Sequence, residues 1–198
     1  TDYGYLNKST VINNVETLAM AARIIELGSE FINKIGTKNS KGTKLLSVSG
    51  DVGKPGIYEV EWGTTIKELL SFKMSQATSP YYVQISGPSG DCIGEHEFHR
   101  EISKEDLKCG GSVMAFSKYR SIIHILENYT NFFKKESCGS CTPCRAGNQI
   151  LYNKIQKMKK GICTSNDLKE IKEWNKIIKL SSKCGLGQFS LRSFAMAI

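Results

Sequence analysis

Apolar residues recur at two different spacings along the chain, and the first spacing is that of a helix. In residues 11–28, VINNVETLAMAARIIELG, apolar side chains return every three or four positions, which is the period of a helix with one buried face. Asn13 and Glu16 stand three residues apart, as in a capping box, and Gly28 supplies a stop. This pattern predicts a helix, followed by a short turn around Ile32.

The spacing changes between about residues 41 and 119, where apolar and polar residues alternate as they do in strands. Thr65 and Glu68 form a second capping box at the start of a short helix, TIKELL. The predicted strands lie at residues 44–49, 57–62, 81–86 and 112–116. Two strands, one helix and then further strands predict an α+β region in which a small sheet packs on a single helix.

A helical spacing returns from about residue 120. Three amphipathic segments predict three helices, the last of which begins at a cap formed by Thr164 and Asp167, and a short fourth segment covers about residues 190–197. The three apolar stripes are Ile122, Ile125, Leu126, Tyr129 and Phe133; Ile150, Leu151, Ile155 and Met158; and Leu168, Ile171, Asn175 and Ile178. Amphipathic helices with short connections predict a small bundle.

Composition places the chain among ordinary globular proteins. Hydrophobic residues make up 40% and charged residues 23% of the 198 positions, and no apolar run approaches the ~18 residues that a membrane span requires. The chain starts at Thr1 without a leader pattern, which predicts a fragment of a longer protein. Its seven cysteines, an odd number, favour a reducing compartment, by default the cytoplasm, and predict metal ligands or free thiols.

The positive charge is concentrated in the helical region. Residues 120–198 carry 14 of the 27 basic side chains but only 5 of the 19 acidic ones. Such a surface suits an acidic protein partner or an anionic cofactor, and the alternative is a solvated, lysine-rich helix surface. Only 5 of the basic residues are Arg and no motif for stacking RNA bases is present, so nucleic acid is not a predicted partner.

The strongest chemical signal is the run KESCGSCTPCRAG, which contains Cys138, Cys141 and Cys144. Three thiolates at this spacing, joined by a remote fourth, are more typical of a cubane iron-sulfur cluster than of zinc, which two pairs of cysteines would suit. Cys184, in the glycine-bounded sequence KCGLG, is the predicted fourth ligand, and Cys163 is its rival. Cys92 and Cys109 are expected to be buried structural thiols.

Local physics supports this run as a binding site. Thr142 can cap a helix, and the proline after it is preferred in the first helical turn. Cys144 would then lie among unpaired amides at the positive end of the helix, where a thiolate and an anionic cluster are stabilised. Gly139, Gly185 and Gly187 allow backbone amides to approach the sulfur atoms.

The segment ESCGSCTPCRAG, followed forty residues later by CGLG, closely resembles the cluster motif of the flavin-carrying, NADH-oxidising subunit of respiratory complex I. Related subunits occur in NAD-linked hydrogenases and formate dehydrogenases. The resemblance extends to VINNVETL, KGTKLLSVSGDVGKPGIYEV and GPSG, so it covers nearly the whole chain in the same order.

This resemblance implies a division into three parts. Residues 1–40 would be a helical segment of the flavin-binding domain, residues 41–119 a ubiquitin-like β-grasp domain of the soluble-ligand-binding type, and residues 120–198 a four-helix bundle that holds a [4Fe-4S] cluster. Its ligands would be Cys138, Cys141, Cys144 and Cys184. By the same resemblance, Ile12, Asn13, Asn14 and Thr17 would line FMN, and helix capping is the alternative role for the two asparagines.

The chain also departs from that family. The glycine-rich FMN and NADH segment, of the GRGGAGFP type, and the proline that usually precedes VxNN are missing, so the chain alone is not expected to oxidise NADH. The expected function is the electron-transfer part of an NADH-dependent oxidoreductase. Its cluster would pass electrons from FMN to a neighbouring iron-sulfur subunit, in a complex that is at most peripheral to a membrane. The alternative is a non-catalytic binding or adaptor module with structural zinc or no metal.

Overall fold

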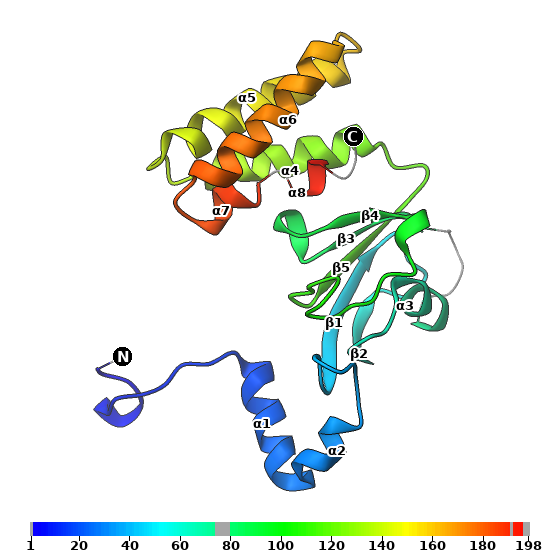
Figure 1. The fold of residues 1–198 in the computed structure, drawn as a ribbon, viewed down its shortest axis with the longest axis vertical. Coiled ribbons are helices and arrows are strands. Elements are labelled where there is room, and N and C mark those ends of the chain that lie inside the picture. The colour runs from blue at the N-terminus through cyan, green and yellow to red at the C-terminus, as the bar shows by residue number, and fades with distance from the viewer. Residues whose placement is uncertain (1, 74–79, 191, 196–198) are drawn as a thin grey trace.

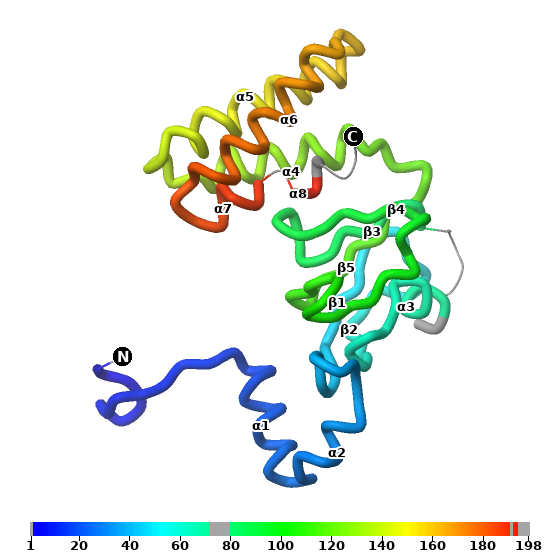
Figure 2. The backbone as a smooth tube through the Cα atoms, viewed as in Figure 1, coloured from blue at the N-terminus to red at the C-terminus, as the bar shows by residue number. Residues whose placement is uncertain are grey.

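A computed structural model describes residues 2–73, 80–190 and 192–195, and it shows a mixed α/β chain. Figures 1 and 2 show the N-terminal helices α1 and α2 at one end, the sheet with α3 in the middle and helices α4–α8 at the other end. The helices are α1 Val15–Leu27, α2 Ser29–Asn33, α3 Ile66–Lys73, α4 Ile122–Glu136, α5 Thr142–Lys159, α6 Ser165–Ser181, α7 Gly185–Gln188 and α8 Arg192–Ala195. The strands are β1 Thr43–Gly50, β2 Gly56–Glu61, β3 Pro80–Ile85, β4 Cys92–Gly94 and β5 Ser112–Ser117.

The five strands form one sheet in the order β2-β1-β5-β3-β4. Strands β1 and β5 at its centre are parallel, and every other pair is antiparallel. Helix α3 covers one face, where Leu46, Ile66, Leu69 and Val83 are at most 1% exposed. Because side chains alternate across a strand, the residues between these core positions point to the opposite face, which looks towards α4.

The sequence prediction is confirmed for four strands and for the short helix. The Thr65–Glu68 capping box is also present: each side chain accepts from the other residue's backbone N–H. The sequence pattern does not predict strand β4, because three residues are too few to show an alternation. Cys92, which begins β4, and Cys109 are both buried, as expected.

Helices α4, α5 and α6 pack around a second apolar core. Leu126 and Leu151 lie at its centre with Ile155, Ile171 and Ile178, each at most 3% exposed. Helix α6 starts at the predicted capping box, in which Thr164 and Asp167 satisfy each other's backbone N–H groups. Of the predicted final segment, Arg192–Ala195 is helical, and residues 191 and 196–197 lie outside the described residues.

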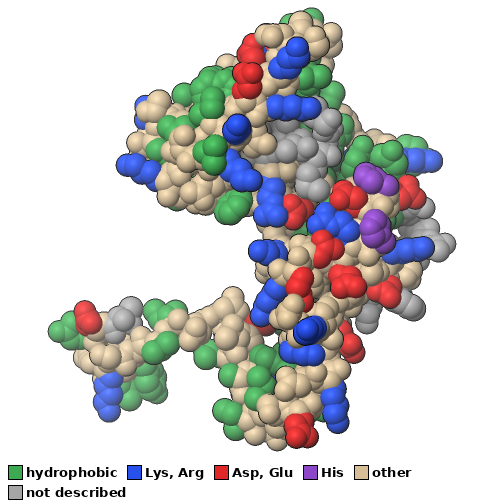
Figure 3. Space-filling model, viewed as in Figure 1, with side chains coloured by type: hydrophobic (Ala, Val, Ile, Leu, Met, Phe, Trp, Pro, Cys, Tyr) green, Lys and Arg blue, Asp and Glu red, His purple; other side chains and the backbone are tan. Residues whose placement is uncertain are grey.

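The N-terminal helices have no buried residue. Asn14, rather than Asn13, caps α1 by accepting from the backbone N–H of Glu16, and Gly28 ends it as predicted. The Glu16 carboxylate binds Lys44 and the backbone N–H of Leu45 instead of closing a capping box. The predicted capping box is therefore wrong, because the Glu16 carboxylate forms a tertiary contact with β1 instead. Figure 3 shows hydrophobic side chains gathered on this segment.

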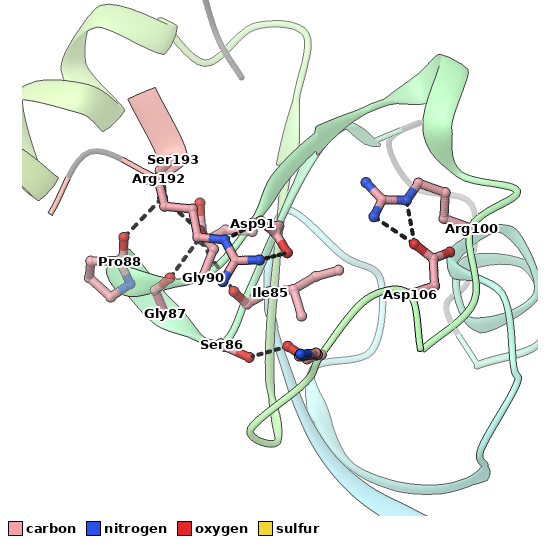
Figure 4. A network of polar contacts seen from close by, with 12 residues as sticks. Ile85, Ser86, Gly87, Pro88, Gly90, Asp91, Arg100, Asp106, Arg192 and Ser193 are labelled. Atoms are coloured by element: carbon pink, nitrogen blue, oxygen red, sulfur yellow. Dashed lines mark hydrogen bonds and ion pairs between the residues drawn. The ribbon is translucent and has the colours of Figure 1, made fainter. Parts of the chain in front are cut away.

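The C-terminal helix α8 is tied to the sheet. The Arg192 guanidinium donates to both carboxylate oxygens of Asp91, at 2.6 and 2.9 Å. The Ser193 hydroxyl donates to the carbonyl oxygens of Pro88 and Gly90 in the adjoining turn (Figure 4). A 3-10 turn, η2, spans Gly87–Ser89, so α8 fixes the connection between β3 and β4.

Candidate metal centre

The cysteine run begins in the connection between α4 and α5, as predicted, and ends in the first turn of α5, where Cys144 lies. Gly139 turns the backbone there at φ +76°, a conformation that glycine adopts without steric cost. The guanidinium of Arg145, in the first turns of α5, donates to the Gly139 carbonyl and holds this turn. Cys141 is the N-cap of α5, so the prediction that Thr142 caps the helix is wrong by one residue: Thr142 is its first helical residue.

Cys144 lies in the first turn of α5. It is 5% exposed, and its Sγ atom lies 3.4 Å from Asn148 Nδ2 and 3.4 Å from Ser137 Oγ. The Asn148 amide can only donate to this sulfur, and the serine hydroxyl can donate as well. The surroundings of Cys144 are therefore arranged to stabilise a sulfur that carries negative charge.

The segment that contains Cys184 lies against the same loop. The pKa of Cys141 is lowered, first by a hydrogen bond from the backbone N–H of Lys183 and then by one from the N–H of Cys144. Lys183 immediately precedes Cys184, which is the N-cap of α7. Since consecutive Cα atoms are ~3.8 Å apart, the Cα atom of Cys184 lies ~3.8 Å from that of Lys183, the residue whose N–H approaches Cys141.

Cys163 lies elsewhere in the helical region. It is in the connection between α5 and α6, where its Sγ contacts the Thr164 carbonyl. Helix α5 has 18 residues, so it is ~27 Å long. Cys141 and Cys144 lie at its start, whereas Cys163 follows its end. The geometry thus separates Cys163 from Cys141 and Cys144 by the length of that helix.

A buried hydroxyl provides a test of whether this site fits a cluster. Ser182 is 6% exposed, and its Oγ has no hydrogen-bond partner among the described residues. A Cβ atom placed on Gly187 would lie 2.4 Å from Ser182 Oγ and 3.2 Å from Cys144 Cβ, so the serine and the cysteine face the same glycine. An unpartnered donor beside a cysteine fits a group rich in sulfur acceptors.

The four predicted ligands differ in burial, and their side chains are not all close together. Cys144 is buried, Cys141 is half-buried, and Cys138 and Cys184 are exposed. Within the described ranges, no three Cys, His, Asp or Glu side chains lie close enough together to hold a metal ion as they stand. The backbone brings Cys141, Cys144 and the start of the Cys184 segment together, whereas no hydrogen bond in the described part of the chain joins Cys138 to the other three.

The residues predicted to line FMN lie in the N-terminal segment. Ile12, Asn13, Asn14 and Thr17 are all exposed, and Asn14 caps α1. The structure therefore gives one of the two asparagines its alternative capping role and leaves the FMN prediction untested. Sequence reasoning missed Ser137, Asn148 and Ser182, because single polar residues beside a motif carry no periodic or spacing signal.

Comparison with known proteins identifies the class of this site. Residues 124–198 match the family model of the NADH-ubiquinone oxidoreductase-F iron-sulfur binding region, which indicates a [4Fe-4S] cluster as the bound group. The chain is 45% identical over 188 residues to the NAD-reducing hydrogenase HoxS subunit alpha of Cupriavidus necator, covering 94% of this chain and 31% of that protein. It is 35% identical over 188 residues to the F subunit of the NADH-quinone oxidoreductase of Aquifex aeolicus, covering 93% and 44%.

The structural comparison agrees with these matches. The crystal structure of an NAD+-reducing [NiFe]-hydrogenase in the H2-reduced state superposes with a TM-score of 0.89 and 36% identity, over 100% of this chain and 35% of that chain. This chain therefore matches a C-terminal part of the complex I flavoprotein subunit family. It spans less than half the length of these relatives. No helix in the described part of the chain is long and apolar enough to cross a membrane.

Proposed function

We propose that this chain is the electron-transfer part of an NADH-dependent oxidoreductase that consists of several subunits. A [4Fe-4S] cluster held by Cys138, Cys141, Cys144 and Cys184 would supply the capacity to accept and release one electron at a time. The observation that supports the proposal most directly is the approach of the Cys184 segment to the triplet: a Cβ atom on Gly187, three residues after Cys184, would lie 3.2 Å from Cys144 Cβ.

The protein groups around the cysteines have defined tasks in this proposal. Cys144, Asn148 and Ser137 form the buried side of the site, where two polar groups meet one sulfur at 3.4 Å and exclude water from it. Hydrogen bonds to sulfur stabilise the more negative state of a cluster and so raise its reduction potential. The exposed Cys138 and Cys184 would complete the ligand set by a local movement of the loops that carry them.

The proposal also assigns the parts of the chain. Residues 120–198 would form the iron-sulfur bundle, with α4, α5, α6 and the α7–α8 segment as its four helical parts. Residues 41–119 would be a β-grasp domain, supported by the strand order β2-β1-β5-β3-β4 around a single helix. Residues 1–40 would belong to a flavin-binding domain, with Ile12, Asn13, Asn14 and Thr17 beside FMN. The exposed apolar side chains of α1 support this assignment.

A neighbouring iron-sulfur subunit would receive the electrons. The basic excess of residues 120–198, with 14 Lys and Arg against 5 Asp and Glu, supports an acidic partner surface near the cluster. The complex would be located in the cytoplasm or on the inner surface of a membrane. NAD(H) and FMN would act only in the full-length parent.

The test of this proposal is anaerobic reconstitution with iron and sulfide. We expect four irons and four labile sulfides per chain, with the broad visible absorption of a cubane. Cys184→Ser should abolish this absorption, and Cys163→Ser, the matched control, should retain it. One zinc without labile sulfide would instead support a structural metal in a non-catalytic binding module, and a requirement for Cys163 but not Cys184 would refute the ligand assignment.

A further inference from the structure

A row of exposed lysines runs along the outer side of helix α6. The lysine row consists of Lys169, Lys172, Lys176 and Lys179. At ~100° per residue, the four side chains fall within an arc of ~80° on the helix surface and span ~15 Å along its axis. Ile171 and Ile178, which face the core of the bundle, lie outside this arc. Figure 3 shows Lys and Arg side chains across the helical end of the molecule.

The acidic residues of α6 do not neutralise the lysine row. Two of the three, Asp167 and Glu170, bind Lys154 of α5. Within the described part of the chain, neither the third, Glu173, nor any other acidic residue forms an ion pair with the lysine row. Like charges three or four residues apart on a helix repel each other and destabilise it. No contact inside the described chain offsets this repulsion, whereas carboxylates of a partner would.

The lysine row leads towards the proposed cluster. Helix α6 ends at Ser181, and two residues later the backbone N–H of Lys183, another exposed lysine, approaches Cys141. Cys184 follows and is exposed. Leu180, next to the last lysine of the row, is 72% exposed. A partner bound along the lysine row would therefore reach the exposed cysteine, and Leu180 would give it an apolar contact.

The composition of this face favours an acidic protein over other anionic partners. A helix that binds a membrane surface inserts an apolar face flanked by lysines, but the apolar face of α6 is buried against α4 and α5. Nucleic-acid sites rely on Arg and on stacked aromatic rings, and the row contains neither. A helix of another protein can present carboxylates at the same spacing of three and four residues on one face, so that each lysine meets one carboxylate.

We propose that the lysine row docks the protein that accepts electrons from this chain, through an acidic segment whose carboxylates repeat at helical spacing. The identity of the partner as the electron acceptor rests on the proposed function, whereas the docking contact itself does not require the cluster. Opposite charges across such a contact speed the encounter of the two proteins and orient them. The orientation would place the partner at the end of α6 where Cys184 lies.

Fluorescence anisotropy of a labelled peptide tests the docking contact without a cluster. The probe is an alanine-based helical peptide of ~20 residues with glutamates at the spacing of the lysine row, and its counterpart carries glutamine at the same positions. Both are titrated with the 198-residue chain at ~0.05 M and ~0.5 M salt. We expect saturable binding of the glutamate peptide at the lower salt only, because exposed charges are screened at the higher salt. The glutamine peptide should not bind.

Two variants that lose the same charge locate the contact. Glutamine in place of all four lysines of the row should weaken binding of the glutamate peptide about tenfold or more, the combined effect of four exposed ion pairs. The control variant carries glutamine at four exposed lysines outside α6 and should bind the peptide as the unaltered chain does. The control positions are Lys34, Lys38, Lys41 and Lys54. Equal affinities of the two variants overturn the proposal, and so does binding of anionic phospholipid vesicles without binding of the glutamate peptide.

Stopped-flow absorbance then tests the partner as an electron acceptor. The reconstituted chain, reduced with dithionite and freed of excess reductant, gives one electron to the copper of plastocyanin, an acidic protein, or to the haem of cytochrome c, a basic one. Loss of the lysine row should slow the reduction of plastocyanin roughly tenfold at low salt and should not slow that of cytochrome c. Equal plastocyanin rates with and without the row, or equal slowing with both acceptors, overturn the proposal. Absence of electron transfer from the unaltered chain to either acceptor refutes the proposed function instead, and the peptide result does not depend on it.

Discussion

At the scale of single residues, the buried hydroxyl of Ser182 carries a prediction about the proposed cluster. Its Oγ has no partner among the described residues, and it faces Gly187 together with Cys144. If the hydroxyl donates to a sulfur of the cluster, Ser182→Ala should lower the reduction potential by some tens of millivolts. A net hydrogen bond contributes about 1 kcal/mol, and ~1.4 kcal/mol corresponds to ~59 mV for a one-electron couple. Redox titration followed by electron paramagnetic resonance measures this shift.

The neighbouring Ser181 supplies the matched control. It is exposed, so Ser181→Ala should leave the potential unchanged while removing the same hydroxyl group. Iron content separates an effect on potential from an effect on cluster binding, because Ser182→Ala is expected to keep all four irons. Equal potentials for the two variants would show that the Ser182 hydroxyl does not reach the cluster.

Some residues of this site can be identified from the sequence alone, and others cannot. Spacing alone singles out Cys138, Cys141 and Cys144, because three thiols in seven positions have few other uses. The flanking glycines favour Cys184 over Cys163, and that choice stays a prediction supported by the Lys183–Cys141 contact. Of the two partners of Cys144, Asn148 lies one turn later in the same helix, whereas Ser137 meets the sulfur only because the connection between α4 and α5 turns back on the start of α5.

At the scale of helices, Gly147 determines how closely α5 and α6 approach. A Cβ atom there would lie 2.3 Å from Ile178 Cδ1 and 3.3 Å from Trp174 Cε3, and Ile178 is 1% exposed. Gly147→Ala should therefore destabilise the chain. Overpacking costs about 1–3 kcal/mol, which exceeds the ~1 kcal/mol that alanine gains over glycine inside a helix.

Urea unfolding followed by circular dichroism measures the effect of Gly147→Ala. Gln149→Ala in the same helix is the control, because Gln149 is exposed and its truncation creates no clash. An increase in the free energy of unfolding of Gly147→Ala would mean that α6 can move aside, and the close approach would then not be required.

The cap of α6 predicts a dependence of stability on pH. The pKa of Asp167 lies well below its usual value, chiefly because of the hydrogen bond from Lys154, then those from the Thr164 N–H and Lys157. Since the folded pKa is below the unfolded value of ~3.9, the stabilisation is complete above pH ~4 and is lost as the pH falls further. Asp167→Asn should be less stable at pH ~7 and should lose less stability than the unaltered chain between pH ~5 and ~2.5.

Urea unfolding at a series of pH values tests this effect of Asp167. Asn166→Ala is the neighbouring control, because Asn166 is exposed and cannot titrate. Parallel curves for Asp167→Asn and the unaltered chain would assign the acid sensitivity to other carboxylates.

The elements themselves show what a sequence pattern can establish. Long amphipathic helices and the four longer strands, β1, β2, β3 and β5, are predictable because burial of one face imposes a period on many residues. Strand β4 and helix α7, with three and four residues, are too short to show one. The capping box predicted at Glu16 is wrong, since a local pattern cannot reveal that Lys44 and Leu45 lie within reach of the acid.

At the scale of the whole molecule, an ion pair connects the C-terminal helix α8 to the sheet region. Arg192 of α8 binds Asp91 at the start of β4 through two hydrogen bonds, and Asp91 is only 8% exposed. Arg192 follows Cys184 by eight residues, so this contact also anchors the chain just beyond the proposed fourth ligand. Loss of the guanidinium would leave a buried carboxylate unpaired at a cost of about 1–3 kcal/mol.

The last prediction concerns how the sheet and the helices unfold together. Arg192→Ala should weaken their coupling, so that differential scanning calorimetry shows two separate transitions where the unaltered chain shows one. Arg100→Ala is the control, because Arg100 also donates two hydrogen bonds to one carboxylate, that of Asp106, but within the sheet region alone (Figure 4). Arg100→Ala should lower the stability of the sheet region without uncoupling its unfolding from that of α4–α6. A single transition in Arg192→Ala, at the temperature of the unaltered chain, would mean that the apolar contact of α4 with Phe116 and Tyr82 couples the two regions without the ion pair.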